Sequence, residues 1–105
     1  MSSTRTAILL QTSFTTITSA SCVLEYMGLN NTHSSGIVVT IQDVAGNVLF
    51  SEAIVASAFT ELRFPSPPFF LDGIKIKAAT ADKVYAFPVY RNPTEPTLSR
   101  GSGVL

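Results

Sequence analysis

Acid–base or nucleophilic chemistry in this chain would depend on its single histidine, His33. Ser34 and Ser35 follow it directly and supply hydroxyls, and Asp43 lies one expected strand further along. A Ser-His-Asp triad needs these groups in hydrogen-bonded contact, and no spacing here implies that geometry. A polar loop residue is the simpler interpretation of His33. The sequence therefore predicts that the protein is not an enzyme.

Metal and thiol chemistry has equally few candidates. Cys22 is the only cysteine and lies in an alternating apolar run, which predicts a small buried side chain rather than a reactive thiol. Asp43 and Asn47 around Gly46 resemble half of a calcium loop, but Ca²⁺ takes about six to eight oxygen ligands. Hydrogen bonds within a turn explain the pair equally well. No glycine-rich phosphate-binding motif occurs, so we expect no metal and no cofactor.

A basic stretch with interleaved tyrosines could form a strand face that stacks on single-stranded nucleic acid. Its members are Lys75, Lys77, Lys83, Tyr85, Tyr90 and Arg91. The whole chain, however, carries seven basic and seven acidic residues, whereas a protein that neutralises many phosphates normally has a basic excess. Outward lysines on a strand also prevent edge-to-edge pairing. We expect no nucleic-acid partner.

Aromatic side chains leave a carbohydrate-binding module open as an alternative. Such modules present exposed rings, and Tyr26, Tyr85, Phe87 and Tyr90 are candidates by position. The chain has no tryptophan, and the same rings serve equally well in a core or in a protein interface.

The elements that must position these residues are strands. No ten-residue window has helical spacing, whereas β-branched and aromatic residues recur in short runs separated by turn residues. This pattern predicts an all-β chain: an antiparallel β-sandwich, jelly-roll or immunoglobulin-like, of about seven or eight strands. The expected strands are 6–11, 13–19 (strand or extended connection), 21–29, 37–43, 48–56, 59–64, 73–79 and 83–90.

Alternation along these strands assigns their faces. Residues 21–29 should turn Cys22, Leu24 and Tyr26 to the core and Val23, Glu25 and Met27 toward solvent or a partner. In other strands the residues expected to face the core are Ile37, Val39, Ile41, Leu62, Phe64, Ile74 and Ile76. Turn residues predict a loop over 30–36, and three prolines predict an extended crossing over 64–70.

The last expected strand, 83–90, is apolar on both faces. In a one-domain sandwich, this pattern predicts that one face meets another chain. Pro88 lacks an amide hydrogen, so the strand should lie at an edge or carry a bulge. The residues expected to contact partners, on this strand and on the arm that follows, are Tyr85, Phe87, Val89, Arg91, Leu98, Arg100, Val104 and Leu105.

Composition also favours a subunit of an assembly. Charged residues make up 13% of the chain, where about 25% is typical, and the net charge is zero. Weak electrostatic repulsion permits association. We expect one sandwich domain over 1–91 and an extended arm over 92–105, which holds two prolines and two glycines and few apolar residues to bury. The sequence shows neither a signal-peptide pattern nor an apolar stretch of about 18 residues, so we expect no membrane anchoring.

Two segments resemble the small all-β structural proteins of tailed-bacteriophage virions. The first, GIVVTIQDVAGNVLFS, has the pattern strand-Asp-x-x-Gly-Asn-strand. The second, ELRFPSPPFFLDGIKIKAATADKVYAFPVYR, passes from a proline and aromatic stretch through Asp-Gly and an alternating Ile/Lys strand to a closing strand near tyrosine. The similarity covers about residues 20–91.

This resemblance implies a non-enzymatic structural role, first of all that of a capsid decoration or cement subunit that binds neighbouring capsid subunits and stabilises the shell. A neck, tail or fibre accessory is the alternative. The implied partners are the major capsid protein or other virion proteins, in a homo-oligomer or symmetric assembly. The implied location is the virion, after synthesis in the host cytoplasm, and decoration proteins of this type often grip adjacent subunits with a terminal arm.

Overall fold

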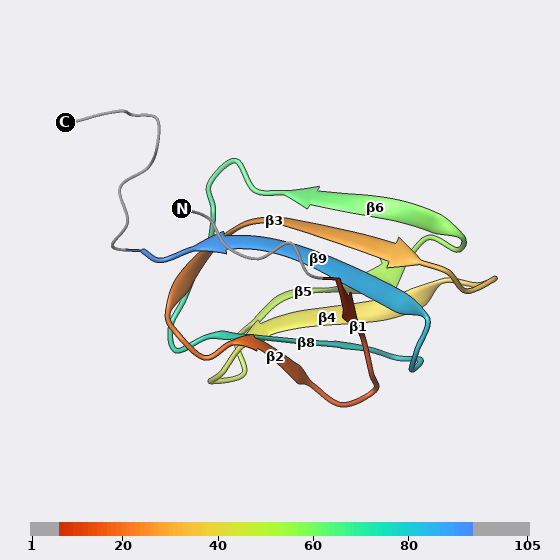
Figure 1. Cartoon of the computed structure of the whole chain (residues 1–105), viewed down its shortest axis with the longest axis horizontal. Helices are drawn as coiled ribbons and strands as arrows, with labels where there is room; N and C mark the ends of the chain where they lie inside the picture. Colours follow the sequence, from red (N-terminus) through yellow and green to blue (C-terminus); the bar gives the residue numbers. More distant parts are fainter. Residues whose placement is uncertain (1–6, 94–105) are drawn as a thin grey trace.

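The computed structural model describes residues 7–93, which form nine strands in two antiparallel sheets (Figure 1). The strands are β1 (Ile8–Leu9), β2 (Thr15–Thr18), β3 (Cys22–Asn31), β4 (Ile37–Asp43), β5 (Val48–Ile54), β6 (Ala58–Arg63), β7 (Phe69–Phe70), β8 (Ile74–Ala78) and β9 (Val84–Arg91). The expected all-β class is confirmed. Within the described range there is no helix, hence none that could cross a membrane.

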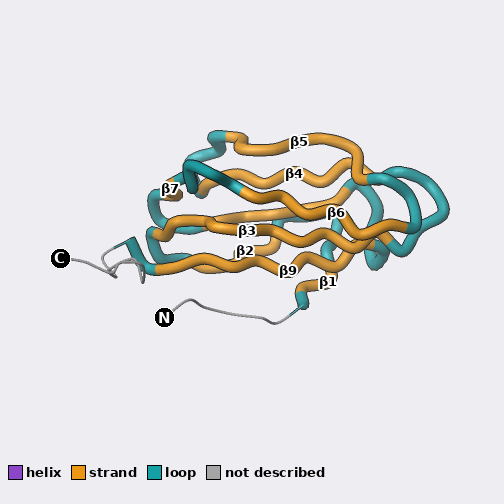
Figure 2. Tube along the Cα trace, turned by 90° about the horizontal axis from the view of Figure 1, so that it is seen from above, coloured by secondary structure: helices purple, strands orange, loops and turns teal. Residues whose placement is uncertain are grey.

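The two sheets form the two layers of a sandwich. The first sheet has the order β1-β9-β3-β6, with β7 also pairing with β3, and the second has the order β2-β8-β4-β5. Figure 1 shows β6, β3 and β9 above β4, β8 and β2, and Figure 2 shows the same strands from above. The pairs are nested along the chain, since β1 pairs with β9, β2 with β8, β3 with β6 and β4 with β5. The chain therefore resembles one long hairpin folded over on itself.

Apolar side chains from both sheets fill the space between the layers. Burying each large aliphatic side chain contributes roughly 1.5–3 kcal/mol, so this cluster supplies the main driving force for folding. Its buried members are Leu10, Cys22, Leu24, Met27, Leu29, Ile37, Val39, Ile41, Ile54, Phe70, Ile74, Ile76, Ala78, Val84 and Ala86. Leu62 and Phe64 pack against them, as expected.

The hairpin of β4 and β5 follows the sequence prediction closely. β4 has the expected bounds, and Ile37, Val39 and Ile41 are buried. Between the strands, the Asp43 amide donates a 3.0 Å hydrogen bond to the Asn47 carbonyl, and Gly46 adopts a φ of +100°. Glycine accepts this conformation at little cost, which explains the turn at this position.

The faces of β3 differ from the prediction beyond Leu24. The register against β9 shifts between Leu24 and Tyr26, so Glu25 is an extra residue in a β-bulge. After the bulge the alternation is reversed: Met27 is fully buried, and Tyr26 lies on the outer face. The predictions that Tyr26 faces the core and that Met27 faces outward are therefore both wrong, because simple alternation cannot anticipate a bulge.

The predicted loop over 30–36 begins later than expected. β3 continues through Asn31, whose side chain is fully buried. Its Nδ2 donates to the carbonyls of Ser35 and Ile54, both at 3.1 Å, and its Oδ1 accepts from the His33 amide at 2.9 Å. Asn31 thus ties the β3–β4 loop to the end of β5.

The proline-rich stretch ends in a short strand that the sequence did not predict. Phe69 and Phe70 pair with Val23 and Cys22 as β7, although residues 64–68 form the expected irregular crossing. Pro88 lies in β9 two residues past Ala86, which pairs with Ile8 of β1. The strand is not at an edge, because β9 pairs with β3 on one side and with β1 on the other, so the expected edge position is wrong. The bulge in this part of the sheet lies in β3, at Glu25, rather than in β9.

Candidate functional site

The outer face of the first sheet gathers aromatic side chains from three strands. The register places Tyr85, Asn30 and Phe59 in one row across β9, β3 and β6. Phe87, Gly28 and Glu61 form the next row, and Val89, Tyr26 and Arg63 the third. We call Tyr26, Phe59, Tyr85, Phe87 and Val89 the aromatic face. Phe59 is 50% exposed and Tyr85 is 37% exposed.

Gly28 at the centre of this face allows the rings to close over the sheet. An added Cβ at Gly28 would lie 2.6 Å from the far end of the Phe59 ring and 3.0 Å from the Tyr26 hydroxyl. The Phe59 and Phe87 rings meet here in a tilted arrangement, with centroids 5.9 Å apart. Such geometry stabilises aromatic pairs beyond their buried area, which favours a preformed apolar surface.

Charged side chains border the aromatic face on the β6 side. The Arg63 guanidinium lies 5.2 Å from the centroid of the Tyr26 ring and forms a 3.0 Å ion pair with Glu61. The Tyr26 hydroxyl donates to the other Glu61 carboxylate oxygen at 3.1 Å. Desolvation and this hydrogen bond both raise the pKa of Tyr26 above its ordinary value. An apolar centre with a polar rim is the usual anatomy of a protein interface.

The residues predicted for partner binding are placed as follows. Tyr85, Phe87 and Val89 all lie on the aromatic face, and Arg91 continues the same side of β9. Arg91 is held by a 2.8 Å ion pair to Glu25, the bulge residue of β3. The other four, on the expected arm, lie outside the described residues: Leu98, Arg100, Val104 and Leu105.

Sequence reasoning missed two members of this face and misplaced a third. Phe59 and Gly28 could be assigned only once the neighbours of β3 were known, because nothing in the sequence says that β6 lies beside it. Tyr26 is the misplaced member, because alternation assigns it to the core and the Glu25 bulge turns it to the outer face. Tyr90, one of the candidate exposed rings, is not part of the face and packs against the core. The signal that was available is the alternation of β6, which places Phe59 on the side of Glu61 and Arg63.

The basic stretch is divided between the two sheets. Lys75 and Lys77 lie on the outer face of the second sheet, where both ammonium groups are near the Phe14 ring, at 5.1 and 4.9 Å from its centroid. Arg91 and Tyr85 lie on the first sheet instead. The continuous basic and aromatic strand face considered from the sequence therefore does not form.

The candidates for acid–base and metal chemistry are also separated. His33 precedes β4 and Asp43 ends it, so roughly 20 Å of strand lies between them. Both Asp43 carboxylate oxygens accept 2.8 Å hydrogen bonds from Asn47, as the turn interpretation predicts. Cys22 is buried, as expected. Across residues 7–93, no three His, Cys, Asp or Glu side chains are grouped closely enough to hold a metal ion.

No family model, curated protein or solved structure matches this chain. The functional argument therefore depends on the aromatic face itself, whose geometry suits binding.

Proposed function

We propose that the protein is a non-enzymatic structural subunit of a virion, first of all a capsid decoration or cement subunit. In this proposal the aromatic face binds a neighbouring capsid subunit. The observation that carries it is the exposed group of rings around Gly28, because an isolated soluble domain gains nothing from leaving such a surface in water. A neck, tail or fibre accessory would use the same face against a different virion protein.

The strand order supports a jelly roll rather than an immunoglobulin-like sandwich. In an immunoglobulin-like domain the first two strands belong to one sheet, whereas β1 and β2 lie in different sheets here. The nested pairing of β1 with β9, β2 with β8, β3 with β6 and β4 with β5 favours the jelly roll, which wraps one long hairpin in this way. Jelly rolls occur in viral capsid and lectin domains, so this topology agrees with the resemblance without establishing a function.

The composition of the face also favours a protein partner. Aromatic residues and arginine are enriched in interface centres, and Tyr26, Phe59, Tyr85, Phe87 and Arg63 are of these types. The rings are held in place by Gly28 and by each other, so little side-chain entropy would be lost on binding. We expect Phe59, at the centre and half exposed, to contribute most of the binding energy.

Co-sedimentation with virions of the phage that encodes the chain, stripped of this subunit, tests the proposal. Phe59→Ser should reduce the bound amount at least about tenfold, since an aromatic anchor at an interface centre contributes roughly 2 kcal/mol or more. Val38→Ser is the matched control, because Val38 is 43% exposed on the outer face of the second sheet. Absence of binding by the wild-type protein would refute the virion role. Equal binding by all three proteins would refute the choice of face.

A carbohydrate-binding module is the second candidate, because a face of tyrosines and phenylalanines that is partly exposed also suits stacking on sugar rings. It would bind a glycan without any protein partner. A glycan microarray probed with the wild-type protein and Phe59→Ser separates the two functions. Saturable, Phe59-dependent glycan binding would favour the module, and its absence together with virion binding would favour the structural subunit.

A further inference from the structure

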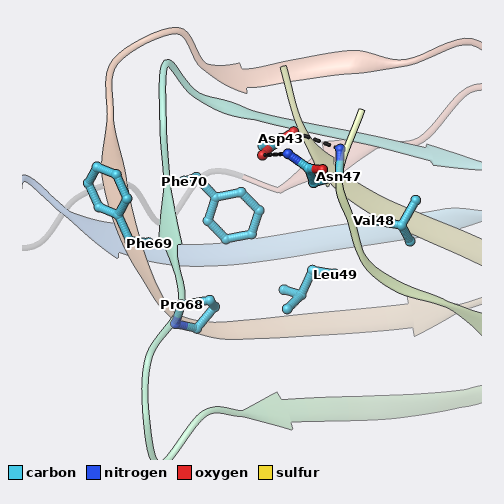
Figure 3. Close-up of a pocket in the computed structure, with 7 residues that line it drawn as sticks. All are labelled: Asp43, Asn47, Val48, Leu49, Pro68, Phe69 and Phe70. Carbon is cyan, nitrogen blue, oxygen red and sulfur yellow. Dashed lines mark hydrogen bonds between the residues drawn. The ribbon is translucent and has the colours of Figure 1, made fainter. Parts of the chain in front are cut away.

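A second apolar surface lies at one end of the sandwich. The β4–β5 turn and the segment that leads into β7 enclose a pocket of about 170 Å³ there (Figure 3). Figure 3 shows Phe70, Leu49 and Pro68 around the pocket, with Asp43 and Asn47 beside it. We call it the end pocket, and its lining residues are Asp43, Asn47, Val48, Leu49, Pro68, Phe69 and Phe70.

The apolar lining of the end pocket is open to solvent. Val48, Leu49 and Phe69 are all exposed, and Phe69 keeps 56% of its surface accessible although it belongs to β7. Leu71 directly follows β7 and is exposed as well. Rings and aliphatic side chains exposed together around a concave site are typical of a surface that binds another apolar group.

The end pocket also carries a fixed negative charge. Hydrogen bonds from the Asn47 side chain and backbone hold the pKa of Asp43 below its ordinary value. Neither of the ion pairs formed within residues 7–93 involves Asp43. A carboxylate offers about four lone-pair sites, so Asp43 can accept a further bond from a cation. The pocket therefore fits an apolar side chain with a basic one close behind it.

The chain leaves β9 close to this pocket. Arg91 and Phe69 flank Val23 from opposite sides, one in β9 and the other in β7. Two strand spacings separate them, roughly 10 Å. Seven residues lead from Arg91 to Leu98, and an extended chain covers at most about 3.3–3.6 Å per residue. Leu98 is therefore within reach of the end pocket of its own chain.

The sequence that follows Pro93 has the chemistry that the pocket requires. It reads TEPTLSRGSGVL, in which Leu98 and Arg100 are two residues apart. In an extended segment, residues at this spacing point to the same side. We infer that residues 94–105 bind the end pocket of their own chain, with Leu98 in the apolar lining and Arg100 paired with Asp43. This inference uses a different surface from the aromatic face, so either proposal can fail alone.

The short connection between β9 and residues 94–105 favours binding to the end pocket of the same chain over binding to a second copy. A short linker gives an effective concentration of about a millimolar, well above that of a second copy in dilute solution. The bound segment would cover an exposed apolar site on the free subunit. Transfer of the segment to a neighbouring virion subunit would then require only an exchange of partners for Leu98.

A fluorescent synthetic peptide with the sequence of residues 94–105 tests the inference against the full-length chain. Wild-type protein should bind it weakly, because the pocket is occupied. Leu98→Ser should release the pocket and bind the peptide at least about tenfold more tightly, measured by anisotropy, since the competing tethered segment is lost. Ser99→Ala is the matched control, because Ser99 points away from the surface in an extended segment, and should behave as wild type.

Each other outcome overturns the inference. Equal binding to the wild-type protein and Leu98→Ser would mean that the pocket is empty in the free chain. Binding to neither would mean that the segment has no affinity for the pocket. Binding that survives Phe69→Ser in the Leu98→Ser background would place the peptide elsewhere. A wild-type oligomer by light scattering that becomes monomeric in Leu98→Ser would show that the segment binds a second copy instead.

Discussion

Phe59 of β6 and Phe87 of β9 meet across the intervening strand β3, with ring centroids 5.9 Å apart. Their contact is possible because β3 presents Gly28 beneath them, where the Phe59 ring occupies the space of a missing side chain. Glycine weakens a strand interior, so its presence here needs a compensating gain. The gain is a layer of aromatic rings that is assembled before any partner binds.

Gly28→Ala should displace Phe59 while the fold stays intact. The new methyl group meets the far end of a half-exposed ring, which can swing outward, and alanine is no worse than glycine within a strand. We expect a change in unfolding free energy within about 1 kcal/mol, but a loss of virion binding comparable to that of Phe59→Ser. Urea unfolding and co-sedimentation measure the two effects separately.

Full virion binding by Gly28→Ala would show that the position of Phe59 does not matter for recognition. A loss of several kcal/mol in stability would show instead that the ring cannot move, and the variant would then report on folding rather than on the interface.

Asn31→Ala should destabilise the fold by roughly 2 kcal/mol, because it leaves the buried carbonyl of Ile54 and the partly buried Ser35 carbonyl and His33 amide without their partner. Asn30→Ala is the natural comparison, since Asn30 lies on the outer face of the same strand. Its cost should stay below about 0.5 kcal/mol. Equal midpoints for the two variants in urea unfolding would contradict the role assigned to Asn31.

Gly73→Ala should be among the most damaging single substitutions. Gly73 has a φ of +122°, and an added Cβ would lie only 2.1 Å from the Thr18 carbonyl oxygen, which is backbone and cannot swing away. We expect a loss of roughly 3–5 kcal/mol. Gly46→Ala shares the positive φ but meets nothing within 4 Å, so it should cost about 1 kcal/mol. Thermal unfolding of both variants separates the clash from the backbone strain.

Much of the fold could be predicted from the sequence, because most strands have a local signal: apolar residues that alternate with polar ones between turn residues. β4 was predicted with its bounds and its three core residues, since Ile37, Val39 and Ile41 alternate with polar residues between clear turn signals. The reversal at Met27 could not be predicted, because the Glu25 bulge is defined only by the register against β9. Asn31 was assigned to a loop on composition, and its burial depends on carbonyls distant in the sequence.

The candidate site was predictable only in part, for a similar reason. Tyr85, Phe87 and Val89 were assigned to an outer face because they share one side of a single strand. Phe59 joins them only because β6 and β9 both pair with β3. The alternation of apolar and polar residues within each strand does not determine which strands are neighbours in the sheet. Lys75 and Arg91 show the reverse case, since proximity in the sequence placed them together and the topology separates them.

The Cys22 thiol should make stability fall at alkaline pH. Burial raises its pKa to about 11 in the folded protein, whereas an unfolded cysteine titrates near about 8.5. The folded state therefore favours the neutral thiol. This contribution is fully present below about pH 8.5 and is lost as the pH rises toward 11, roughly 3 kcal/mol in all. The measurement is the difference between wild type and Cys22→Ala in urea unfolding from pH 7 to pH 10, so that pH effects common to both proteins cancel. The wild-type protein should lose stability more steeply, and its thiol should react with Ellman's reagent at pH 8 only once unfolded. Parallel curves, or rapid labelling of the native protein, would mean that β7 opens readily and exposes Cys22, which pairs with Phe70 beside the end pocket.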